Sequence, residues 1–131
     1  MARPDFTARY PIHVTMRLVN GLPNLRRKQL ATLVFSAFRE AKAHLGTRVV
    51  QFSVQSNHLH VIAETEDRRT LARAMKGLAV RLARRLNREL DRTGRVFSER
   101  YHARSLKTPL EVRRALVYVL RNNHKHSSGP G

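Results

Sequence analysis

The sequence contains no cysteine among its 131 residues, so disulfide bonds and thiolate metal sites are excluded. It also has no run of the roughly 18 apolar residues that a membrane-spanning helix requires. The segment Met1-Ala2-Arg3-Pro4-Asp5 lacks the apolar stretch of a secretory signal peptide. These absences predict a cytoplasmic protein without a membrane partner.

Acidic residues are scarce. Nine Asp and Glu stand against 26 Lys and Arg, which gives a formal net charge of +17. Such an excess indicates a polyanionic partner, with nucleic acid the first candidate, an anionic membrane surface the second and acidic proteins the third. Arginine heavily outnumbers lysine, and its planar guanidinium suits phosphate contacts and base stacking. We therefore expect a nucleic-acid partner and a nucleoid-associated location.

Length and hydropathy pattern predict one domain over residues 1–126 and a disordered tail over 127–131. Residues that alternate between apolar and polar predict strands over 11–19, 48–56, 58–64 and 95–106. Helical spacing predicts helices over 25–45, 69–91 and 108–125. The last helix begins with the capping box Thr108-Pro109-Leu110-Glu111. The order βαββαβ plus a C-terminal helix predicts an α+β, ferredoxin-like fold with an antiparallel sheet.

The alternation also predicts which face of the sheet each side chain occupies. The row Val50, Phe52 and Val54 is expected to face the first two helices, and Leu59, Val61 and Ala63 are expected to do the same. The opposite face then carries the polar side chains His13, Thr15, Arg17, Gln51 and Ser53. We expect the C-terminal helix to bury its apolar side against this polar face or at the edge of the sheet.

His58 and His60 are separated by one residue on a predicted strand, so both imidazoles project from the polar face. Two imidazoles at this spacing are able to bind one metal ion such as Mn²⁺ or Zn²⁺. The alternative is a pair of ordinary surface histidines, because a His-x-His pattern alone is weakly specific. Glu64 lies on the same face and is interpreted as a surface acid at the strand end.

Tyr118 and Asn122 are four residues apart and therefore lie on one face of the last helix. An apolar stripe runs beside them and contains Val112, Leu116, Val119 and Leu120. If that stripe packs on the sheet, Tyr118 faces the histidine row. The alternative is a packing tyrosine whose hydroxyl lies in water.

Several segments resemble one family. Ser56-Asn57-His58-Leu59-His60-Val61-Ile62 resembles the HUH motif of the IS200/IS605-like single-tyrosine (Y1) transposases, and looks closest to REP-associated tyrosine transposases. Residues 12–15, 81–87, 94–102 and 115–123 resemble further segments of that family in the same order. The resemblance therefore covers nearly the whole chain.

The resemblance implies a metal-dependent endonuclease and strand transferase acting on single-stranded DNA near hairpins. Tyr118 would be the nucleophile that forms a 5′-phosphotyrosine, and His58, His60 and Asn122 would bind Mg²⁺ or Mn²⁺. Many relatives have Asn-Pro-Val after the tyrosine turn, whereas this chain reads Asn122-Asn123-His124. That departure leaves the subgroup open and makes His124 a competing ligand. Monomer and homodimer both stay open.

Basic side chains are expected to contact the DNA phosphates, largely through electrostatic attraction. Those expected to contact nucleic acid are Arg17, Arg81, Arg84, Arg85, Arg100, His102, Arg104 and Lys125. For the helix face that carries residues 81–88, a merely solvated charged surface is the alternative.

Two other classes of function stay open. A non-catalytic, basic nucleic-acid-binding module of ferredoxin-like fold would present aromatic residues on its central strands, as RNA-recognition domains do. Aromatic residues are only 6% of this chain, which disfavours that interpretation. A structural or ribosome-associated basic protein would leave the histidine pair and the tyrosine helix unused. A relative of the transposases that kept DNA binding and lost cutting also stays open.

Overall fold

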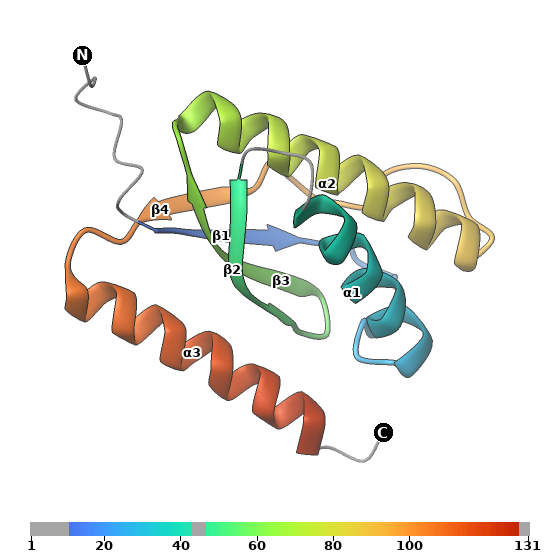
Figure 1. Ribbon diagram of the computed structural model, residues 1–131. Coiled ribbons are helices and arrows are strands. Elements are labelled where there is room, and N and C mark those ends of the chain that lie inside the picture. The colour runs from blue at the N-terminus through green and yellow to red at the C-terminus, as the bar shows by residue number, and fades with distance from the viewer. Residues whose placement is uncertain (1–10, 43–46, 129–131) are drawn as a thin grey trace.

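The computed structural model describes residues 11–42 and 47–128, with side chains described for residues 11–40 and 47–121. The elements follow in the order β1 (Ile12–Arg17), α1 (Lys28–Lys42), β2 (Thr47–Val54), β3 (His58–Thr65), α2 (Arg68–Glu89), β4 (His102–Ser105) and α3 (Pro109–Ser128). The strands form one antiparallel sheet in the order β2-β3-β1-β4 (Figure 1). The predicted α+β fold with an additional C-terminal helix is confirmed.

The two faces of the sheet are covered by different helices. Helices α1 and α2 pack on one face, and α3 lies across the other (Figure 1). The main core forms between the sheet and the first two helices, where Val14, Phe38 and Leu78 are fully buried. A smaller cluster joins α3 to the opposite face through Ile62, Leu106, Ala115 and Val119. The polar face predicted from the alternation is therefore the face under α3.

Side-chain caps define where α2 and α3 begin. The Asp67 carboxylate accepts a 2.7 Å hydrogen bond from the Thr70 backbone N–H at the start of α2. The Thr108 hydroxyl accepts one of 3.1 Å from the Glu111 N–H at the start of α3. These bonds satisfy backbone donors that have no partner within a helix. The N-cap expected at Thr108 is confirmed, whereas the Glu111 carboxylate accepts a 3.2 Å hydrogen bond from the Thr108 hydroxyl and not from the backbone N–H that a capping box uses.

A β-bulge in β2 makes one predicted orientation wrong. Val49 pairs with Ala63 and Gln51 pairs with Ile62, which leaves Val50 as an extra residue. Val50 is 38% exposed, whereas Val49 is 5% exposed. A bulge shifts the alternation by one residue, so Val49 faces the core in place of Val50. Phe52 lies beyond the bulge and stacks on Phe38 as expected, with ring centroids 4.3 Å apart.

The ends of three elements differ from the predictions by three residues or more. Helix α1 begins at Lys28 and not at residue 25, because Leu25 is buried in the preceding turn. The fourth strand, predicted over 95–106, spans only His102–Ser105, since its earlier part pairs with the end of β1 through an isolated Leu18–Phe97 bridge. Helix α3 continues to Ser128, so residues 127 and 128 of the predicted tail are helical. The predicted end of the first helix at residue 45, the N-terminal segment 1–10 and residues 129–131 lie outside the described residues.

Candidate active site

One polar row crosses the sheet under α3. Pairing between the strands brings Ser53, His60, Thr15 and His102 into line, one from each strand. Directly paired residues of antiparallel strands point to the same face, so these side chains share the face that α3 covers. The neighbouring row contains Gln51, Ile62, His13 and Arg104. Histidines from β1 and β3 therefore meet near the middle of the sheet.

His60 is the central residue of this cluster and is buried. Its Nδ1 atom lies 3.1 Å from Nε2 of His13 and 3.4 Å from Oγ1 of Thr15. The ring of His58, two residues earlier on β3, lies nearly parallel to that of His60 with centroids 6.2 Å apart. Three imidazoles thus project from adjacent strands onto one face.

Burial controls the charge of this cluster. Burial first, and then the nearby His13 and His58, together lower the pKa of His60 from 6.5 to about 4. Burial followed by the positive charge of Arg104 lowers the pKa of His13. Both rings are therefore neutral at pH 7. A neutral imidazole keeps the lone pair that a metal ion requires.

Tyr118 approaches the histidines from α3. Its ring lies 5.2 Å from that of His60, edge to face, and 6.4 Å from that of His13. Its neighbours on the helix, Ala115 and Val119, are buried against the sheet, so Tyr118 lies at the margin of the helix–sheet contact and is 46% exposed. Its hydroxyl accepts a 3.4 Å hydrogen bond from Nε2 of Gln55. The phenol is thus both close to the histidines and open to a large substrate.

The described residues supply only part of a metal site. No cluster of three His, Cys, Asp or Glu residues suited to a metal ion occurs among them. His58 and His60 offer two imidazole nitrogen donors on one face, and beside His60 the buried Ser53 hydroxyl has no hydrogen-bond partner. Buried polar atoms normally have a partner, so this place suits a hydrated cation. Asn122 belongs to α3 one turn after Tyr118, but its side chain and that of His124 lie outside the described residues.

The comparisons with known proteins decide the family. Residues 8–122 match the family described as "Transposase IS200 like". This chain belongs to the IS200-like transposases. No curated protein matches it.

Two solved structures share the fold of this IS200-like transposase. A REP-associated tyrosine transposase bound to a REP hairpin has a TM-score of 0.71 and 14% identity, covering 96% of this chain and 73% of its own. A candidate transposase from Deinococcus radiodurans R1 has a TM-score of 0.63 and 15% identity, covering 94% of this chain and 98% of its own. The family resemblance seen in the sequence is confirmed, and the likeness to both structures is one of fold.

Three of the basic residues predicted to bind nucleic acid belong to β1 and β4, beside the histidines of the transposase. Arg17 is the cross-strand partner of His58, and Arg104 is that of His13. Both are exposed.

His102 is exposed too, and its Nε2 atom lies 3.1 Å from a Glu99 carboxylate oxygen. Arg100 is exposed in the segment before β4. Among the described residues, α3 contacts mainly β2 and β3, so these basic side chains stay exposed beside it.

The three predicted arginines of α2 lie on the other side of the sheet from Tyr118 (Figure 1). Arg85 makes a 2.6 Å ion pair with Glu40 of α1, and Arg81 makes a 3.9 Å pair with the same carboxylate. These two side chains join α1 to α2. Arg84 is exposed. The side chain of Lys125 lies outside the described residues.

His13 is a site residue that the spacing of the sequence did not single out. Its alternation placed it on the polar face, but only the pairing of β1 with β3 brings it next to His60. The sequence feature that could have identified His13 was the segment Ile12-His13-Val14-Thr15, which resembles a segment of the transposase family. Gln55 and Ser53 were likewise recognised as site neighbours only from the structure.

Proposed function

We propose that this transposase cuts and rejoins single-stranded DNA through a covalent bond between Tyr118 and a 5′-phosphate. The observation that supports the proposal is the meeting of a phenol from α3 with an imidazole from β3, whose ring centroids are 5.2 Å apart. A tyrosine that serves only to pack its helix on the sheet does not require an imidazole beside its ring. A nucleophile that attacks a phosphodiester needs groups nearby that bind and polarise the phosphate.

The reaction exchanges one phosphodiester for another. The Tyr118 oxygen attacks phosphorus, the bond from phosphorus to the 3′ oxygen of the preceding nucleotide breaks, and that oxygen leaves as a 3′-hydroxyl after taking up a proton. The phenolic proton is released to solvent. A 3′-hydroxyl of the same or another strand then attacks the phosphotyrosine and restores the phenol. Because the number of phosphodiester bonds is conserved, joining needs no nucleotide cofactor.

We propose a Mg²⁺ or Mn²⁺ site formed by His58, His60 and Asn122. A divalent cation bound there would neutralise the charge that develops on the phosphate during attack. The burial that lowers the pKa of His60 to about 4 keeps this donor neutral at physiological pH. Arg17 and Arg104, exposed beside the histidines, would hold the phosphates on either side of the scissile bond.

Single-stranded DNA with a hairpin is the proposed substrate. A protein of the same fold has been solved with a REP hairpin bound. Arg100, His102 and Lys125 would add phosphate contacts near the site, and Arg81, Arg84 and Arg85 would add contacts on α2. The described histidines and Tyr118 come from one chain, so the proposal requires no second copy.

The test is the formation of a covalent adduct. The protein is incubated with a labelled hairpin oligonucleotide and Mg²⁺ or Mn²⁺, and the products are separated on a denaturing gel. We expect an adduct with the wild type, none with Tyr118→Phe, and an adduct with the control Tyr101→Phe, which removes a hydroxyl outside the proposed site. An adduct that persists in Tyr118→Phe would exclude this residue as nucleophile.

The net charge of +17 also supports a second candidate, a nucleic-acid-binding module without catalysis. The same gel separates the two. A binding module retains the oligonucleotide under native conditions and forms no adduct under denaturing ones with any metal.

A further inference from the structure

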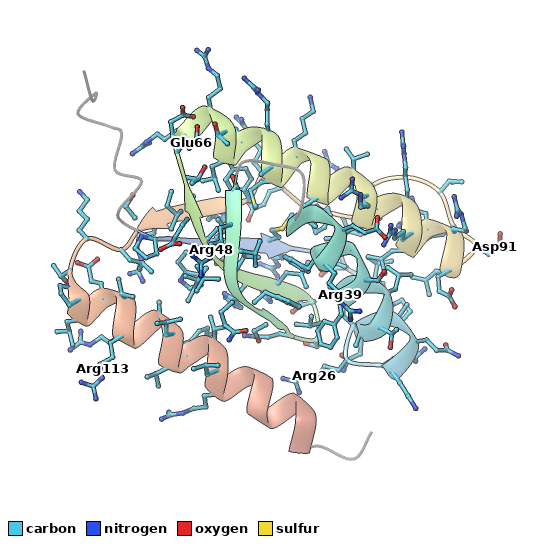
Figure 2. The ribbon with its side chains drawn as sticks, viewed as in Figure 1. Arg26, Arg39, Arg48, Glu66, Asp91 and Arg113 are labelled. Carbon is cyan, nitrogen blue, oxygen red and sulfur yellow. The ribbon has the colours of Figure 1, made fainter. Side chains whose placement is uncertain are left out.

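The outer side of α2 carries a line of cations, which we call the α2 basic stripe. It consists of Arg69, Arg73, Lys76, Arg84 and Arg88, all of them exposed. At 3.6 residues per turn these positions fall on one side of the helix, opposite the buried Leu71, Met75 and Leu82. With a rise of 1.5 Å per residue the stripe is about 28 Å long. Figure 2 shows nitrogen-tipped side chains projecting from α2 away from the sheet.

The charges of the stripe are not compensated. In residues 11–40 and 47–121, none of its five side chains forms an ion pair or a hydrogen bond. The adjacent Arg81 and Arg85 differ, because Glu40 pairs with both. Four members of the stripe line an open groove of about 610 Å³, together with Gly77, Val80 and the paired Arg81 and Arg85. A row of five unpaired cations repels itself, and a polyanion in the groove would remove that cost.

The stripe lies far from the candidate active site. Helix α2 covers one face of the sheet, and Tyr118 approaches the other (Figure 1). A helix is about 10 Å across, so the outer side of α2 stands well over 10 Å from the sheet, on the side away from the histidines. A phosphate attacked by Tyr118 therefore cannot lie in this groove. The stripe therefore suits a different segment of nucleic acid.

We propose that the α2 basic stripe binds the phosphate backbone of duplex DNA at a site separate from the cleavage site. The proposal rests on the proposed function for its choice of DNA. Its straight row of cations suits a stiff, regular phosphate array, and 28 Å corresponds to about eight base pairs. Surfaces that bind unpaired strands add aromatic side chains on which bases stack, and the stripe contains none. The contacts would be to phosphates and would not depend on base sequence.

The duplex DNA bound by the stripe can come from two sources. One is the stem of the hairpin whose unpaired strand is cut, and the other is a separate flanking or target duplex. Both present the same phosphate array to the stripe. A hairpin stem would have to run around the edge of the sheet from one face to the other. A separate duplex would bind while the hairpin occupies the opposite face.

The test uses the full chain carrying Tyr118→Phe, without added metal, so that binding is measured independently of cutting. The stripe variant is Arg73→Gln, Lys76→Gln and Arg88→Gln. The matched control is Arg27→Gln, Lys28→Gln and Arg39→Gln, which removes the same charge from exposed residues at α1. Thermal unfolding of each variant establishes that it is folded. Affinity for a labelled 20-base-pair duplex is measured by fluorescence anisotropy at several salt concentrations.

We expect the stripe variant to lose at least about tenfold in duplex affinity and to reduce the slope of log K against log salt by about 2 to 3, whereas the control reduces it by less than about 1. Equal losses in both variants would overturn the proposal, because net charge alone would then explain them. An equal or larger loss with an unpaired 20-mer would overturn the choice of duplex. If the duplex still binds when the protein is saturated with hairpin, the stripe binds a separate duplex. If the hairpin competes with the duplex, and hairpins with longer stems bind more tightly, the stripe binds the hairpin stem.

Discussion

The Nε2 atom of His13 lies 3.1 Å from the Nδ1 atom of His60. The two residues come from neighbouring strands, β1 and β3, and both rings are neutral at pH 7 because burial lowers their pKa values. One nitrogen of His60 is thus occupied by a partner, which orients the ring and leaves Nε2 for a metal. Metal-binding histidines are commonly held in this way by a group on their second nitrogen.

Replacing His13 should therefore weaken metal binding although His13 is not a proposed ligand. We expect His13→Ala to lower the affinity for Mn²⁺ by about 10- to 100-fold, measured by isothermal titration calorimetry. The control is His102→Ala, which removes an exposed histidine from the same sheet face and should change the affinity less than twofold. Wild-type Mn²⁺ affinity in His13→Ala would show that His60 needs no such support.

Stability should fall in mild acid because of His60. Its pKa is lowered from 6.5 to about 4 in the folded state. Between these values the unfolded chain binds more protons than the folded one, so the free energy of unfolding decreases as pH falls from about 6.5 to 4. We expect a loss of about 1 kcal/mol between pH 7 and pH 5, after allowance for screening by water. Urea unfolding at both pH values measures it, and His60→Gln should have a smaller loss. A loss as large in His60→Gln would assign the effect to other groups.

Packing of α3 on the sheet should control the reactivity of Tyr118. Val119 is fully buried and Val117 is 45% exposed, on the same helix. We expect Val119→Ala to destabilise the protein by about 1 to 2 kcal/mol and to slow adduct formation, because the helix that carries the phenol loses a core contact. Val117→Ala should change stability by less than about 0.5 kcal/mol and leave adduct formation unaltered. Thermal unfolding and the denaturing gel provide the two measurements. Equal effects of both substitutions would mean that this contact does not hold Tyr118 in place.

Metal removal should abolish cutting without unfolding the protein. The main core is built of apolar side chains, with Val14, Phe38 and Leu78 fully buried, and none of the proposed metal ligands belongs to it. We therefore expect the fold to persist without a cation. We expect EDTA to eliminate the covalent adduct, excess Mn²⁺ to restore it, and the circular dichroism spectrum to stay the same throughout. His58→Ala should require more Mn²⁺ for the same adduct yield. Unfolding on addition of EDTA would instead indicate a structural metal.

The arrangement of elements was accessible from the sequence because it depends on local rules. Spacing along the chain predicted the order βαββαβ and the extra helix, and alternation predicted that His58 and His60 share one face while Leu59 and Val61 face the core. The same rules failed at Val50, because a single inserted residue reverses the phase of a strand and leaves little trace in the pattern.

What the sequence by itself determined is therefore the fold class, the face on which the histidine pair lies and the strongly basic character of the chain. The tertiary structure alone decided that His13 touches His60 and that Tyr118 lies over the same row. It also decided that Glu40 pairs with Arg81 and Arg85, whereas the α2 basic stripe has no ion pair among the described residues. The reason is physical. Periodicity reports the direction of a side chain within its own helix or strand, whereas contacts between distant residues depend on strand register and on how the helices pack.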